Sequence, residues 1–158
     1  MQISGLIHQL SPAIKLFIFF FIISLSFGYF AGYKYLLKNN SVKPSGIETN
    51  YNGNENDEDS AEMIFKKPEK EILTIIHTHA ISMSLIFFAL GCLIAITSIN
   101  EKLKLFLLVE PFVSILVTFG GIWLLWKEVT WMKYLIMISG ITMTISVVLM
   151  VVIISWQL

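Results

Sequence analysis

Long apolar stretches separated by polar segments make up most of this chain. Four such stretches cover residues 13–37, 79–99, 103–126 and 132–156. Each has about the 20 residues that a helix needs to cross the hydrocarbon core of a bilayer. The pattern therefore predicts four transmembrane helices.

The connections between these stretches predict how the helices are arranged. Residues 100–102 and 127–131 are tight turns, and short connections make consecutive helices antiparallel. Residues 38–73 are polar, rich in Asn and Gly, and carry an acidic run over residues 55–62. This composition favours a flexible loop that buries no core, although its end, from residue 62, fits a short amphipathic lead-in to the next helix.

We therefore expect an all-α protein, an integral membrane four-helix bundle with one long polar loop between helices 1 and 2. Residues 1–37 would form an N-terminal segment and transmembrane helix 1, and residues 38–73 the flexible polar loop. Residues 74–158 would form transmembrane helices 2–4. Both termini then lie on the same side of the membrane.

The first apolar stretch is interpreted as a permanent helix. It is too long for the core of a signal peptide and does not end in a clear cleavage site. Ser24, Gly28 and Gly32 recur in it at a spacing of four. Because small residues let helix backbones approach closely in lipid, this spacing predicts a packing face.

Composition and charge support a membrane protein and exclude several other classes. The chain is 56% hydrophobic and 14% charged, whereas soluble domains average about 45–50% and 25%. Its net charge is zero, so it lacks the basic surface of a nucleic-acid binder. The single cysteine, Cys92, excludes an internal disulfide and any zinc finger or iron–sulfur cluster held by this chain alone.

The lysines divide unevenly between the two sides of the predicted membrane. The positive-inside rule would place the loop side in the cytoplasm, whereas a first helix with a short N-terminus often enters with that terminus inside, so the orientation stays open. The expected surroundings are the lipid bilayer of the cell inner membrane and either other membrane-protein subunits or a homo-oligomer. Eight of the eleven lysines lie on the loop side: Lys34, Lys38, Lys43, Lys66, Lys67, Lys70, Lys127 and Lys133.

Two histidines near the start of the second helix are candidate ligands for haem or a transition metal. His77 and His79 point about 200° apart on a helix, so they cannot face one metal together. His79 and Met83 share a face, and Met132 and Glu128 lie on the same side of the membrane. The candidate cofactor ligands are thus His77, His79, Met83 and Met132, and the candidate metal ligands His79 and Glu128. The alternative is that the histidines cap a helix start and the methionines fill gaps.

The third histidine does not complete such a site. His8 precedes the first helix, a full membrane crossing away from His77 and His79. A haem with two histidine ligands from one chain is therefore not expected, and any second ligand would come from another subunit.

Glu110 is the second candidate site. An acid within hydrocarbon is costly unless it is protonated, paired or hydrated, so it is a functional candidate by default. Pro111 removes a backbone donor beside it. Alternatively, the acid is structural and accepts hydrogen bonds from Ser114, four residues on, or from hydroxyls of the fourth helix. The candidates there are Thr142, Thr144 and Ser146.

Four short segments carry a resemblance to a known group of proteins. They are Glu69-Lys70-Glu71, His77-Thr78-His79, Glu110-Pro111-Phe112 and Gly120-Gly121. With these segments the last 95 or so residues resemble small uncharacterised four-helix bacterial inner-membrane proteins, which have a His-x-His at the head of the second helix. The same tripeptide is similar to one in the catalytic subunits of haem-copper oxidases and nitric-oxide reductases. That similarity implies a respiratory association, not an oxidase activity.

Three functions are compatible with these features. The leading hypothesis is a non-enzymatic accessory or assembly subunit of a membrane complex, with a histidine pair that meets haem, a metal or a partner. The first alternative is a small proton-coupled transporter or channel that uses Glu110, and the second is a purely structural membrane protein. The sequence has no Gly-x-Ser-x-Gly elbow, no phosphate loop and no Cys/His nucleophile pair, which argues against an enzyme.

Overall fold

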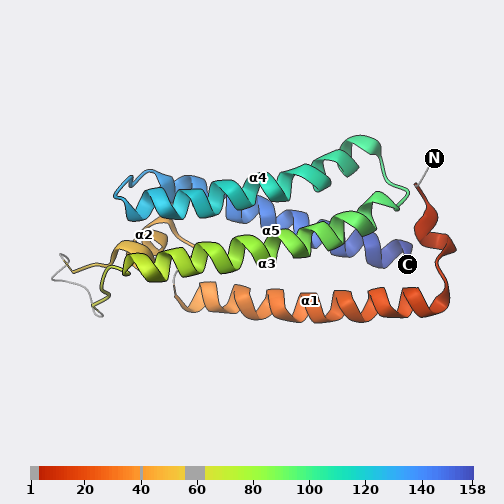
Figure 1. Ribbon diagram of the computed structural model, residues 1–158, viewed down its shortest axis with the longest axis horizontal. Helices are drawn as coiled ribbons and strands as arrows, with labels where there is room; N and C mark the ends of the chain where they lie inside the picture. The colour runs from red at the N-terminus through yellow and green to blue at the C-terminus, as the bar shows by residue number, and fades with distance from the viewer. Residues whose placement is uncertain (1–3, 40, 56–62) are drawn as a thin grey trace.

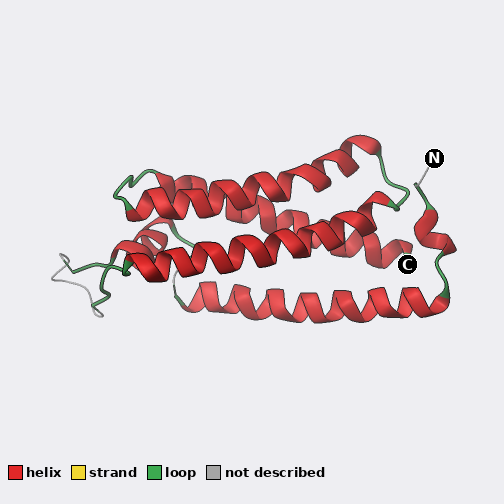
Figure 2. Ribbon diagram, viewed as in Figure 1, coloured by secondary structure: helices red, strands yellow, loops and turns green. Residues whose placement is uncertain are grey.

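The computed structural model describes residues 4–39, 41–55 and 63–158. Every regular element in these ranges is helical (Figures 1 and 2). In chain order the elements are the 3-10 helix η1 (Leu6–Gln9) and the α-helices α1 (Pro12–Lys38), α2 (Pro44–Asn52), α3 (Glu69–Ala95), α4 (Glu101–Trp126) and α5 (Met132–Gln157).

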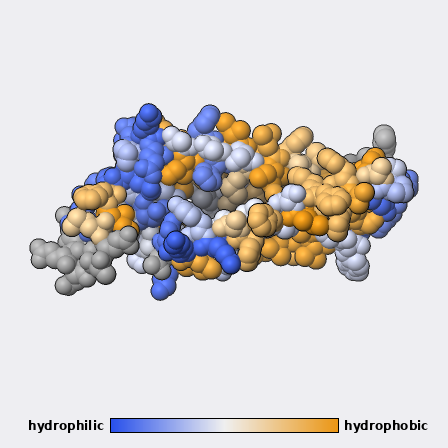
Figure 3. Space-filling view, turned by 90° about the horizontal axis from the view of Figure 1, so that it is seen from below, coloured by the Kyte–Doolittle hydropathy of each residue, from blue (hydrophilic) through white to orange (hydrophobic). Residues whose placement is uncertain are grey.

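Four of these helices are long and apolar enough to cross a membrane. They are α1, α3, α4 and α5, with 26 or 27 residues each. The predicted all-α fold with four membrane-spanning helices is thereby confirmed. Figure 3 shows hydrophobic side chains over much of the length of the bundle and hydrophilic side chains gathered towards its ends.

Local sequence explains where several helices begin and end. Pro12 and Pro44 stand in the first turn of α1 and α2, where the missing amide hydrogen has no helical partner to lose. The Asn100 side chain accepts a hydrogen bond from the Lys102 amide at 2.9 Å and so caps α4. At the other end of α4, Glu128 adopts a positive φ of 71° and closes the helix.

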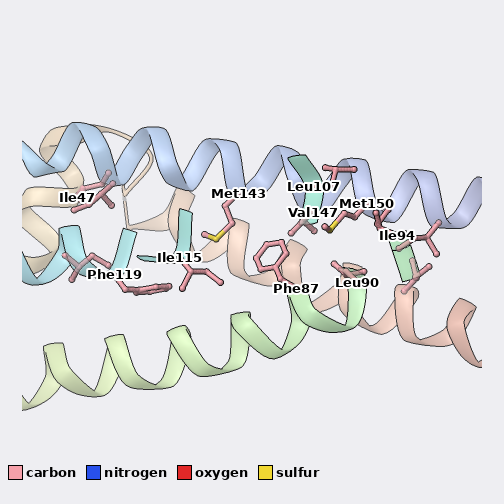
Figure 4. Packing of buried hydrophobic residues seen from close by; sticks show 14 of the residues in the cluster. Ile47, Phe87, Leu90, Ile94, Leu107, Ile115, Phe119, Met143, Val147 and Met150 are labelled. Atoms are coloured by element: carbon pink, nitrogen blue, oxygen red, sulfur yellow. The ribbon is translucent and has the colours of Figure 1, made fainter. Parts of the chain in front are cut away.

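The helices α3, α4 and α5 form an antiparallel bundle, and α1 lies along it (Figure 1). In the core, Phe87 and Leu90 of α3 meet Leu107 of α4 and Val147 and Met150 of α5 (Figure 4). All five side chains are buried. The share of the apolar window that the rest of the chain buries is 44% for α4 and only 11% for α1, so α1 is the least enclosed of the four spans.

The segment predicted as a loop contains a helix, which corrects that expectation. The helix α2 packs on the ends of α4 and α5, with Ile47 buried, and Asn52 Nδ2 donates to the Leu125 carbonyl at 2.7 Å. The Trp126 indole in turn donates to the Lys67 carbonyl at 2.8 Å. These contacts make a cap on one end of the bundle. Of the acidic run, residues 56–62 lie outside the described residues.

The opposite end of the bundle carries η1 and the C-terminus (Figure 1). Ile7 is fully buried there, and its amide donates to the Ile96 carbonyl at 3.2 Å. Lys15 Nζ, in the first turn of α1, donates to the Leu158 carbonyl at 2.6 Å. Both ends of the described chain are therefore held at one end of the bundle.

The glycines that allow close helix packing are not the ones predicted. A Cβ atom built on Gly28 or Gly32 meets nothing within 4 Å, so the small residues of α1 pack against no helix of this chain, and the predicted packing face is wrong within the monomer. A Cβ atom on Gly121 would instead lie 2.8 Å from Ile136 Cγ1. Gly121 thus permits the close approach of α4 and α5.

Candidate functional site

Glu110 lies on α4, where two hydroxyl groups hold its carboxylate. Ser114 Oγ, one turn further along α4, donates to Glu110 Oε1 at 2.5 Å. Ser146 Oγ of α5 donates to Glu110 Oε2. The expected hydroxyl partners from both helices are thus present, one on each carboxylate oxygen.

Further hydroxyls extend this contact into a polar seam between α4 and α5, which comprises Glu110, Ser114, Thr118, Ser139, Thr142 and Ser146. Ser114 Oγ and Thr142 Oγ1 lie 3.0 Å apart, and Thr118 Oγ1 and Ser139 Oγ lie 2.7 Å apart. The α4 members recur every four residues and therefore share one face. The seam satisfies polar groups that lipid cannot.

Thr144, the remaining candidate partner of Glu110, belongs to a different contact. It accepts a hydrogen bond from Tyr29 OH of α1 at 3.0 Å and donates to the Gly140 carbonyl at 2.8 Å. It therefore joins α1 to α5 rather than binding the acid. Tyr29 was not among the predicted site residues.

A groove on the surface of the bundle leads to the seam. Its volume is about 650 Å³, and its lining includes the polar residues Glu110, Ser114 and Thr142. Lys102, in the first turn of α4, lines the same groove. Glu110 follows Lys102 by eight positions, which is about 12 Å of helical rise. The remaining lining is apolar: Leu105, Phe106, Val109 and Val113.

Pro111 sits beside the acid within α4 and is buried. Because proline has no amide hydrogen, the carbonyl of Leu107 loses its usual helical donor. The helix nevertheless continues without a break. An acid, three hydroxyls and a backbone carbonyl freed from the helical ladder thus occur along one stretch of two neighbouring helices.

The structure places the two histidines on α3 with separate surroundings. The helix begins at Glu69, so His77 and His79 lie two turns or more inside it rather than at its head. His79 Nδ1 lies 2.9 Å from the Ile75 carbonyl, and its ring centroid lies 5.9 Å from that of Phe119. His77 is exposed and lines a shallow depression with Glu69 and other residues of its own helix.

The other predicted ligands have partners of their own. Glu128 Oε1 lies 2.9 Å from Lys66 Nζ, and this hydrogen bond and charge lower the pKa of the Glu128 carboxyl. Met83 and Met132 are half-buried against the apolar core. Within the described ranges no three His, Cys, Asp or Glu side chains group closely enough to hold a metal ion. Ligation by His77 or His79 stays a prediction that needs ligands from elsewhere.

One charged residue in the bundle was not expected to be buried. Lys104 of α4 is 7% exposed, and its ammonium contacts Ser4 Oγ at 2.9 Å and Glu101 Oε1 at 3.3 Å. From sequence alone, a lysine near a helix end is expected to lie at the surface with its ammonium group extended towards water. Its burial here depends on the N-terminal segment, which folds back over the turn between α3 and α4.

Four apolar helices, a short helical cap and an acid satisfied by hydroxyls define a multi-pass membrane protein. Residues 41–158 match the family described as a transmembrane helical domain (Aq_1264_TM). The chain belongs to this family, and the match takes in α2, α3, α4 and α5. No curated protein and no solved structure matches the chain.

Proposed function

We propose that this protein is a non-enzymatic accessory or assembly subunit, which binds another membrane protein through α1. The supporting observation is the exposure of α1. Its side chains point into the bundle at Ile18 and Ile22, but every residue from Phe30 to Lys38 is exposed. The helix α1 also precedes the region matched by the family. It is therefore an appendage on a three-span unit.

The open face of α1 has the features of a helix–helix contact in lipid. Association in a bilayer gains little from hydrophobicity and depends on close packing. Gly28 and Gly32 stand one turn apart with open space beside each of them. Phe27, directly before Gly28, is largely exposed, and so is Tyr35, which follows Gly32 by three residues on the same side of the helix. A partner helix could pack its backbone onto the glycines and its side chains against Tyr35.

Crosslinking in native membranes tests this proposal. A photoreactive amino acid at Phe27 should form an adduct with a second membrane protein, whereas the same group at buried Ile22 should react only within the chain. Gly28→Leu and Gly32→Leu should each reduce the Phe27 adduct at least tenfold, because about 1.4 kcal/mol of lost packing is already a tenfold change in association. Proper folding of each variant is checked by its monomeric behaviour in detergent.

The outcomes separate the candidate functions. An adduct of twice the mass of the chain would replace the accessory subunit with a homo-oligomer. The absence of any adduct at Phe27, or an adduct unchanged in both leucine variants, would mean that α1 faces lipid alone and would contradict the proposal. A purely structural membrane protein would then be the better description.

A further inference from the structure

The carboxyl group of Glu110 has hydrogen-bond donors but no positive partner among the described residues. The ion pairs there use other acids: Glu48, Glu71, Glu101 and Glu128. Charge without a counter-ion is unfavourable at membrane depth. The simplest way to remove the charge is to bind a proton.

The hydroxyls around Glu110 suit both protonation states without any movement of the backbone. Serine and threonine hydroxyls can donate or accept. In the ionised state Ser114 donates to Glu110 Oε1 at 2.5 Å, and Thr142 can donate to Ser114, since either of these two can be the donor. When Glu110 carries the proton, it donates to Ser114, Ser114 donates to Thr142, and Thr142 donates to the Ser139 carbonyl, 3.0 Å away. Every member stays bonded in both states.

A groove reaches this network from one end of the bundle. The groove that contains Glu110 extends to Lys102 in the first turn of α4, at the end of the bundle that carries the chain termini (Figure 1). In the other direction the seam ends at the buried pair of Thr118 and Ser139. Beyond this pair α4 buries only apolar side chains and Gly121, namely Phe119, Ile122 and Leu125. The groove therefore connects Glu110 with the Lys102 end of the bundle, and the buried side chains of α4 provide no polar group beyond Thr118.

We propose that Glu110 is a reversible proton-binding site inside the membrane, which exchanges its proton along the groove from the Lys102 end. A proton fits better than a sodium ion. Both carboxylate oxygens already receive hydroxyl hydrogens from Ser114 and Ser146, so each oxygen is satisfied without a metal ion. Lys102 is the only charged residue besides Glu110 in the groove lining, and α5 presents hydroxyls alone. This inference does not depend on the partner proposed for α1.

A membrane-permeant carbodiimide tests the site, because it reacts with carboxyl groups in their neutral form in an apolar environment. The full-length protein in lipid nanodiscs is treated over a pH series, and the adduct is located by mass spectrometry. We expect one adduct at Glu110 that decreases as the pH rises. Glu110→Gln should abolish it. Glu101→Gln, the matched control on the same helix, should leave it unchanged, because Glu101 is exposed to water.

The serine donors provide a second readout. Ser146→Ala removes a hydrogen bond that favours the ionised carboxylate, so at a pH where wild type labels slowly this variant should label about tenfold faster. Ser114 is bonded to Glu110 in both protonation states, so Ser114→Ala should change the labelling rate less than Ser146→Ala. The helical content and detergent elution of each variant establish that it is folded.

Three results would overturn the proposal. One is folded protein that forms no adduct at Glu110 at any pH. Another is labelling of Glu110 that does not change with pH. The third is protection of Glu110 by sodium ions at constant pH and ionic strength, which would identify a metal-cation site instead of a proton site.

Discussion

Glu128 ends α4 in a backbone conformation that glycine usually supplies. Its φ is 71°, and the amides of Glu128 and Val129 donate to the carbonyls of Leu125 and Leu124 at 2.9 and 3.0 Å, as in a Schellman motif. A side chain in this region is strained, whereas glycine is not. The carboxylate of Glu128 pairs with Lys66 at the same time.

Replacement of Glu128 separates the backbone effect from the ion pair. Glu128→Gly and Glu128→Ala both lose the contact with Lys66, but only glycine relieves the positive φ. We expect Glu128→Gly to melt a few degrees higher than Glu128→Ala, as measured by circular dichroism in detergent. Equal midpoints for the two variants would show that the turn relaxes out of this conformation.

The partners of Glu110 could be predicted at this scale, but the histidine cluster could not. Ser114 follows Glu110 by one turn, so the helical period alone places it beside the acid, and antiparallel packing brings Ser146 of α5 to the same level. For His79 and Glu128, sequence specifies only the side of the membrane. The rotation of α3 about its axis decides which residues each side chain meets, and it places the His79 ring beside Phe119.

At the scale of elements, the pairing of α4 with α5 depends on one of two adjacent glycines. A Cβ atom on Gly121 would lie 2.8 Å from Ile136 Cγ1, and Ile136 is buried. A Cβ atom on Gly120 meets nothing within 4 Å. The two positions are therefore a matched pair within one helix.

Alanine at each position should act in opposite directions. Gly121→Ala forces Ile136 to move and should lower the free energy of unfolding by about 1–3 kcal/mol. Gly120→Ala adds helix propensity without a clash and should raise it by up to about 1 kcal/mol. Unfolding in mixed micelles with increasing dodecyl sulfate measures both. If Gly121→Ala had a higher free energy of unfolding than Gly120→Ala, the close contact of α4 and α5 at Gly121 would be refuted.

Long apolar stretches predict the spans well, but they predict neither α2 nor the start of α3. The helix α2 has nine residues and a polar composition, and it is held by Ile47 and by its contact with the end of α4 rather than by its own pattern. The helix α3 begins with three charged residues, Glu69, Lys70 and Glu71, which no apolar pattern marks as helical. Hydropathy therefore detects where a helix meets lipid, not where it begins.

At the scale of the whole molecule, the loose attachment of α1 could not be derived from composition. A face that meets lipid and a face that meets another helix are both apolar in a membrane protein. The structure distinguishes them: α1 is fixed by Lys15, Tyr29 and the two buried residues Ile18 and Ile22, and every residue from Phe30 to Lys38 is exposed. The polar cap, in contrast, is tied to the bundle through hydrogen bonds from several segments.

Tyr51 makes the stability of this cap depend on pH. Its backbone carbonyl accepts from the Lys67 amide at 3.1 Å, and burial, with a smaller contribution from Tyr35, raises the pKa of its phenol from 10.0 to about 12. The folded cap thus favours the neutral phenol. The resulting stability is fully present below pH 10 and is lost as the pH rises towards 12, to the extent of at most about 2–3 kcal/mol.

An alkaline titration with a matched variant measures this effect. Tyr51→Phe keeps the ring but has no proton to lose, so its cap should open at a higher pH than that of wild type. Trp126 reports the opening, because its indole donates to the Lys67 carbonyl within the cap. Its fluorescence is followed from neutral pH upwards in proteins whose other three tryptophans are replaced by phenylalanine. The pair of Lys133 with Glu48 also weakens at alkaline pH, in both proteins alike. Only the difference between the two curves therefore reports Tyr51, and coincident curves would show that its phenol ionises without opening the cap.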